Sequence, residues 1–146
     1  MKRVPLLLAC LLTGTITACA DNDRITQDAN ELPQPSRDLL TRHFTTTAVS
    51  HIKIEKNFFG VEGYDVILTD GSHVEFNRKG EWKEIKTSRS AIPSALIPAS
   101  IRTYVAQHYP GMEILTIDKD AKDYEIDLKN GIELKFNLEG KLIDID

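Results

Sequence analysis

The feature that most constrains the fold is a pattern that occurs twice. Residues 73–85 read HVEFNRKGEWKEI, and residues 133–145, sixty positions later, read ELKFNLEGKLIDI. The residues just before them repeat at the same offset, since YDVIL at 64–68 matches YEIDL at 124–128. An ordered series of matches at one offset predicts a duplicated unit, and two long copies indicate a duplicated domain rather than a solenoid.

The similarity continues upstream at an offset of 65 residues. The matching pairs are Pro33 with Pro98, Leu40 with Val105, His43 with His108, and Phe44 with Tyr109. The change of offset predicts a longer loop in the first copy, over residues 56–63. We therefore predict a first repeat over residues 32–87 and a second over residues 92–146.

Each copy begins with a helix signal. In the second copy, Pro98 suits a first helical turn and Pro110-Gly111 ends the helix. Apolar and aromatic residues recur between them at helical spacing, at Ile97, Ile101, Tyr104, Val105 and His108. The first copy predicts a shorter helix from Pro35 to Phe44.

Four strands are predicted after each helix. The first strands cover residues 51–54 and 114–117, and the second strands alternate apolar with polar residues from Tyr64 and from Tyr124. Asp70-Gly71 and Asn130-Gly131 are strong hairpin signals, and a second glycine turn follows in each copy. Alternation predicts one dry and one wet sheet face, with the helices on the dry face. The fold class is thus α+β, with tandem helix-plus-four-antiparallel-strand units. We expect them to join in one long curved sheet, with packing as pseudo-symmetric halves as the alternative.

The N-terminus has the order of an export signal. Lys2 and Arg3 precede an apolar run from Val4 to Leu12, which is too short to anchor stably in a bilayer. Residues 16–19, ITAC, have the form of a lipobox, so we predict a lipoprotein signal at 1–18 and lipidation of Cys19. Ordinary cleavage before Asp21 is the alternative. Residues 19–31 are polar and predict a flexible tether. We expect export across the inner membrane and lipid anchoring to the outer membrane.

Charge and cysteine content exclude several classes of function. Removal of residues 1–18 leaves 16 basic and 22 acidic residues, a net charge of −6. No basic stripe is present, so we expect no nucleic-acid partner. Both cysteines, Cys10 and Cys19, precede the predicted domains, which therefore contain no disulfide and must be stabilised by packing.

The sequence shows no catalytic or metal-binding motif. No two histidines stand at i, i+4 spacing, and the acidic segment 118–123 lacks the glycine of a calcium loop. His43 and His108 are expected to cap carbonyl groups at helix ends or to pack on the sheet. Alternation places five carboxylates on the wet face, at Asp65, Glu75, Glu125, Asp127 and Glu133. They alternate with Lys129 and Lys135, as in exposed cross-strand pairs. We predict no enzyme activity, no cofactor and no metal site.

Contact residues are expected where the first copy departs from the second. Phe58 and Phe59 lie in its longer loop, Trp82 replaces Leu142, and Ile67 on the wet face replaces Asp127. Exposed aromatic residues often anchor interfaces, so we predict partner binding by Phe58, Phe59, Ile67 and Trp82. The alternative is that both phenylalanines fold back onto the core and that Trp82 lies under the helix.

These residues resemble the PepSY-like family, which is also described as beta-lactamase-inhibitor-like. The resemblance rests on an aromatic-acidic-apolar strand, an Asp/Asn-Gly hairpin and Phe-Asn-x-x-Gly-x-Trp/Leu, at 64–85 and 124–145. Helix starts at 32–33 and 97–98 match as well, and the resemblance covers about residues 31–146. It implies a periplasmic or surface location and a sheet surface that binds other proteins, and it supplies no catalytic residues.

The sequence thus favours an envelope-anchored, non-enzymatic module that binds a protein or peptide, and the resemblance adds an inhibitor-like role as an expectation. The alternative is a structural or assembly lipoprotein held in an envelope complex by its sheet edges.

Overall fold

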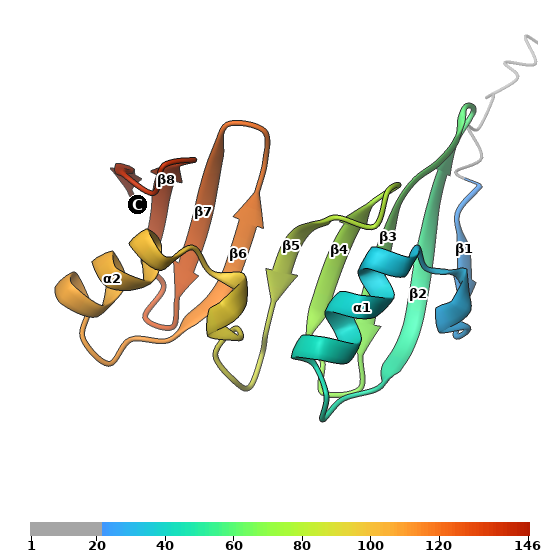
Figure 1. The fold of residues 1–146 in the computed structure, drawn as a ribbon, viewed down its shortest axis with the longest axis horizontal. Coiled ribbons are helices and arrows are strands. Elements are labelled where there is room, and N and C mark those ends of the chain that lie inside the picture. The colour runs from blue at the N-terminus through green and yellow to red at the C-terminus, as the bar shows by residue number, and fades with distance from the viewer. Residues whose placement is uncertain (1–21) are drawn as a thin grey trace, which may run out of the picture.

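The computed structural model describes residues 22–146, so the predicted signal at 1–18 and Cys19 lie outside the described residues. The described chain forms one antiparallel sheet of nine strands, and each strand pairs with its neighbours in sequence order (Figure 1). The strands are β1 (Arg24–Thr26), β2 (Val49–Asn57), β3 (Gly60–Leu68), β4 (His73–Asn77), β5 (Trp82–Lys86), β6 (Ile114–Lys119), β7 (Asp123–Leu128), β8 (Glu133–Asn137) and β9 (Leu142–Ile145).

Two helices of equal length cover one face of this sheet. They are α1 (Gln34–His43) and α2 (Ala99–His108), and both lie on the same side in Figure 1. Each begins directly after a proline, Pro33 or Pro98, and each contains ten residues, so the prediction of a shorter first helix from Pro35 is wrong. Short 3₁₀ turns, Ala29–Glu31 and Ser94–Leu96, precede them. The α+β class is confirmed, with the helices on one face.

The core lies between the helices and the sheet. A single row of fully buried side chains crosses seven consecutive strands on the helix side, one residue per strand. Its members, in strand order, are Ile52, Val66, Val74, Ile85, Ile117, Ile126 and Leu134. From the helices, Leu40, Ile101 and Val105 pack into the same cluster. Because the row is unbroken, one hydrophobic core extends over the whole sheet.

The pairing of β5 with β6 makes the sheet continuous. Ile85 stands opposite Ile117, with Glu84 opposite Asp118 and Lys86 opposite Thr116. The N–H of Thr87 also donates to the carbonyl of Leu115 at 2.8 Å. The expectation of one sheet joined edge to edge is therefore confirmed, and the alternative of separately packed halves is wrong.

The flexible tether predicted over residues 19–31 is wrong for its described part. Residues 24–26 form β1, which pairs antiparallel with residues 52–54 of β2. Asp23 binds Lys53 at 3.0 Å, and Arg24 forms an ion pair with Glu31. The edge of β2 offers unpaired backbone groups, so a polar segment that passes beside it can become a strand without an apolar pattern of its own. Among residues 22–146 no helix is long and apolar enough to cross a bilayer.

Candidate binding surfaces

The face of the sheet opposite the helices, the open face, carries a row of charged residues. Strand alternation places these residues on it, since their neighbours along each strand are the buried residues of the core. Each of these residues stands directly opposite the next one on the neighbouring strand, from Lys53 on β2 to Asp144 on β9. The full row is Lys53, Asp65, Glu75, Glu84, Asp118, Glu125, Lys135 and Asp144.

Five adjacent strands contribute five carboxylates to the centre of this row. We call Asp65, Glu75, Glu84, Asp118 and Glu125 the acidic row. Neighbouring strands lie about 4.8 Å apart, so these groups repel one another unless cations lie between them. The sequence placed three of the five on the wet face. It missed Glu84 and Asp118, because their meeting depends on the pairing of β5 with β6.

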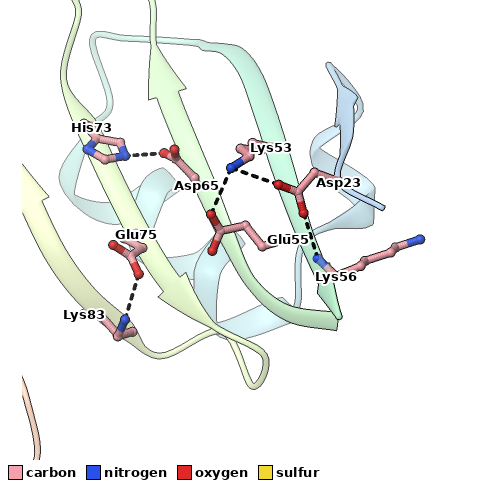
Figure 2. A network of polar contacts seen from close by, with 8 residues as sticks. All are labelled: Asp23, Lys53, Glu55, Lys56, Asp65, His73, Glu75 and Lys83. Atoms are coloured by element: carbon pink, nitrogen blue, oxygen red, sulfur yellow. Dashed lines mark hydrogen bonds and ion pairs between the residues drawn. The ribbon is translucent and has the colours of Figure 1, made fainter. Parts of the chain in front are cut away.

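The ends of the row are neutralised by partners on the same face. In the first half, the ring of His73 binds Asp65, Lys83 binds Glu75 at 2.7 Å, and Lys53 binds Glu55 at 3.2 Å (Figure 2). In the second half, Lys135 binds Glu125 at 2.5 Å and Asp123 at 3.3 Å. These pairs leave the middle of the row as its most negative part.

Glu84 and Asp118 at the middle form no ion pair with any residue that the structure describes. Burial raises the pKa of Asp118, and the neighbouring carboxylates of Glu84 and Glu125 raise it further. The hydrogen bond to Asp65 raises the pKa of His73 above its ordinary value. Burial is thus the first cause of the pKa shift of Asp118, and neighbouring negative charge adds to the shifts of both groups. The centre of the open face is therefore suited to a cationic contact.

Ile67 lies on the open face, one row away from the carboxylates. It stands between His51 and His73, and His73 in turn stands opposite Lys86. The predicted contact residue thus lies on a half-buried apolar spot flanked by two imidazoles. The same row in the second half holds Asp127 and Glu133.

Phe58 and Phe59 lie at the end of the β2–β3 hairpin, which we call the aromatic tip. Their side chains are 97% and 92% exposed, and the rings meet edge to face with centroids 5.5 Å apart. The N–H of Phe59 donates to Asn57 Oδ1 at 2.7 Å, which shapes the turn, and Gly60 follows at φ 123°. The alternative that these rings fold back onto the core is wrong.

Trp82 lies on the opposite side of the sheet from Ile67. It stands across from buried Phe76 and packs partly against the core. Lys119 Nζ lies 5.6 Å from the centroid of its ring, and a groove of about 770 Å³ opens there between α1 and the β6–β7 turn. The four predicted contact residues therefore occupy three separate surfaces.

His108, the last residue of α2, contacts its own helix. His108 Nδ1 donates to the carbonyl of Tyr104 at 3.0 Å, and the two rings stack 4.0 Å apart. In the described part of the chain, no group of three or more His, Cys, Asp or Glu side chains is arranged to hold a metal ion.

Comparison with known proteins assigns this chain to a family. The family model described as "Putative beta-lactamase-inhibitor-like, PepSY-like" matches residues 62–144. The chain belongs to the PepSY-like family. The resemblance seen in the sequence is confirmed. None of the curated protein sequences matches this chain.

Three solved structures of this PepSY-like chain's relatives come from two Bacteroides species. A "putative periplasmic protein from DUF2874 family" of Bacteroides vulgatus ATCC 8482 is 41% identical, with a TM-score of 0.80 over 87% of this chain and 98% of that one. A second B. vulgatus "putative periplasmic protein of unknown function" is 40% identical, with a TM-score of 0.81 over 85% and 98%. A "putative calcium-regulated periplasmic protein" of Bacteroides thetaiotaomicron is 40% identical, with a TM-score of 0.80 over 85% and 96%.

Proposed function

We propose that this PepSY-like chain is an envelope-anchored, non-enzymatic module that binds a protein or peptide partner through the open face. One observation carries the proposal: the helices cover only one side of the sheet, so the other side presents a continuous surface over nine strands. Such a surface is large and rigid, which suits recognition of a folded partner. The inhibitor-like description of the family model supports a role in protein binding.

The charge of the open face defines the partner. Glu84 and Asp118 at its centre call for a basic group, while Ile67 offers an apolar contact to one side. A cation that docks between the two carboxylates relieves their mutual repulsion, so charge complementarity favours the complex and speeds encounter. The partner is therefore a protein or peptide with a basic patch beside an apolar one. Trp82, on the other side of the sheet, is a separate candidate contact.

The anchoring and the duplication belong to the same proposal. Lipidation of Cys19 would hold the module at the outer membrane, in the periplasm or at the cell surface. The descriptions of the relatives as periplasmic support this compartment. We also infer that residues 32–87 and 92–146 are tandem repeats. The matching registers support this, since Tyr64 pairs with Phe76 as Tyr124 pairs with Phe136.

Photo-crosslinking in cells tests the proposal even though the partner is unidentified. A photoreactive amino acid at position 67 should give an adduct of defined mass, because this position lies on the open face. The matched control carries the same amino acid at the exposed position 107 of α2 and should give no such adduct. Adducts from position 107 alone would place the binding surface on the helix side and contradict the proposal.

A double variant that removes two negative charges then tests whether the acidic row binds the partner. Glu84→Gln with Asp118→Asn should reduce the adduct from position 67 several-fold, because the cationic contact is lost. The control double variant, Asp38→Asn with Glu139→Gln, removes the same charge from exposed positions away from the acidic row and should leave the yield unchanged. Equal yields from both double variants would show that charge on the open face does not select the partner.

A structural or assembly lipoprotein is the second candidate, favoured by the edge of β9. The outer edge of β5 is filled by β6, whereas β9 has no neighbour beyond it among residues 22–146. Ile143 and Ile145 on that edge are 56% and 48% exposed. A photoreactive group at position 145 that captures a stable stoichiometric neighbour, when position 67 captures nothing, would favour this function.

A further inference from the structure

The aromatic tip projects beyond the rest of the sheet. The pairing of β3 with β4 ends at Gly63 and Asn77, but β2 and β3 stay paired further, through Lys56 with Val61 and Asn57 with Gly60. At about 3.4 Å per residue, this two-stranded ribbon extends roughly 10 Å past its neighbour. Figure 1 shows the β2–β3 hairpin rising past both β1 and β4.

Two apolar rings at the end of a projecting ribbon are not needed for the fold. Both are more than nine-tenths exposed and contact each other instead of the core. Arg78 from the neighbouring turn lies beside Phe59, around a shallow hollow that Glu62 also lines. The carboxylate of Glu62 accepts a hydrogen bond from Asn57 Nδ2 at 2.5 Å. Aromatic rings next to a long cationic side chain are suited to the boundary between lipid headgroups and acyl chains.

The start of the described chain is fixed at the base of this hairpin. Asp23 Oδ1 accepts a hydrogen bond from the backbone N–H of Lys56 at 3.1 Å, and Asp23 Oδ2 binds Lys53 at 3.0 Å (Figure 2). Cys19 precedes Asp23 by four residues. Four residues span at most about 14 Å, so the Cα of Cys19, the residue that would carry the lipid, can lie no further than that from the Cα of Asp23.

We propose that the aromatic tip inserts into the surface of the membrane that holds the lipid on Cys19. This rests on the anchoring in the proposed function, but assigns Phe58 and Phe59 to lipid and not to a protein. A lipid anchor alone leaves a domain free to rotate, whereas a second contact at the aromatic tip restricts its orientation. The strands then point towards the bilayer, and the open face stands at its side, accessible to a partner.

A fluorescent label at the tip tests this inference on the full lipidated protein. Apart from Cys19 and Cys10 of the predicted signal the chain has no cysteine, so Phe59→Cys supplies a single thiol for an environment-sensitive nitrobenzoxadiazole label. We expect a several-fold rise in its emission when the protein moves from detergent-free buffer into phosphatidylethanolamine–phosphatidylglycerol vesicles. We also expect quenching by lipids brominated near the headgroup. Phe58→Ser in the same labelled protein should reduce the quenching, because one inserted ring is lost.

The matched control is Ser90→Cys, an exposed position in the loop after β5, at the other end of the strands. Its label should show neither change. Equal signals from both labels, or no quenching at position 59, would overturn tip insertion. So would a signal at position 59 that appears only when a partner protein is added. Label uptake by the chain without an added cysteine reveals a free thiol at Cys19 and overturns the anchoring premise instead. Crosslinking from position 67 stays a separate readout of partner binding.

Discussion

The two halves of the sheet share their inner ladder and differ at their outer surfaces. Val66 pairs with Val74 in one half as Ile126 pairs with Leu134 in the other, and all four residues are fully buried. Each half also has a register shift at the same place, between Glu75 and Phe76 and between Lys135 and Phe136. The differences that change chemical character lie at the surface: a projecting aromatic hairpin against a short turn at Asp120, and half-buried Ile67 against Asp127. Packing thus constrains what is common to both halves, and surface contacts account for what is not.

The strand edges show the same contrast. β5 and β9 end their halves in equivalent positions, yet β5 pairs with β6 while β9 forms the edge of the described sheet. Pairing makes Glu84 a central residue of the acidic row, whereas Asp144 on β9 lies outside the acidic row and stays exposed at the end of the full charged row. Similar strands therefore acquire different roles from their neighbours alone.

The largest expected effect comes from equivalent core residues. Phe76→Ala and Phe136→Ala each remove a fully buried ring and should each lower the free energy of unfolding by about 3–5 kcal/mol. Because β5 and β6 join the halves, Phe136→Ala should also shift the unfolding transition reported by Trp82, the only tryptophan. Urea titration by fluorescence and circular dichroism measures this. If Trp82 unfolds at an unchanged midpoint in Phe136→Ala, the halves are independent.

A smaller effect distinguishes two glycines of the second half. Gly131 and Gly140 both have positive φ, 86° and 78°, so alanine at either costs about 1–2 kcal/mol. A Cβ at Gly131 meets nothing, whereas a Cβ at Gly140 would overlap the side chain of Ser100 in α2. Gly140→Ala should therefore lose a further 1–3 kcal/mol, roughly the cost of overpacking. Thermal denaturation compares the two, and similar losses would mean that α2 moves aside at no cost.

The smallest effect is a pH dependence confined to the first half. The hydrogen bond to Asp65 raises the pKa of His73 in the folded chain, and the second half has Glu133 at that position. The folded state then binds the proton more tightly, so this stabilisation is full below the ordinary pKa of 6.5 and is lost as pH rises through the folded pKa. His73 stays partly solvated, so we expect less than about 1 kcal/mol.

Denaturant titrations between pH 5 and pH 9 on the parent chain, His73→Gln and Asp65→Asn measure this contribution. Both variants should lose the same part of the slope, because each removes one partner of the pair. A slope that persists in His73→Gln would assign the pH dependence to other groups.

Local signals predicted most of the secondary structure. Pro33 and Pro98 mark the helix starts, and the glycine turns at Gly71 and Gly131 join the strands expected from alternation. Local signals did not predict β1, where Ile25 is the only apolar residue of a three-residue strand and stays 70% exposed. That strand exists because of the edge of β2, which no local pattern reports.

For the candidate surfaces too, the sequence predicted one part and the tertiary structure decided the other. The sequence marked Phe58, Phe59, Ile67 and Trp82 as departures between the two predicted copies, but not that they lie on three surfaces. For Ile67 and Trp82, strand alternation and the bulge in β5 decide which face each takes. For the aromatic tip, the length of the hairpin decides its exposure.

The sequence by itself determined the repeated pattern, the dry face and the turns, since these depend on residues close together in the chain. Only the tertiary structure decided that β6 completes the edge of β5, that five carboxylates meet in one row, and that Asp23 lies at the base of the aromatic tip. These arrangements depend on hydrogen bonds between backbone groups far apart in sequence. Every strand carries such groups, so the identity of the residues does not select the pairing.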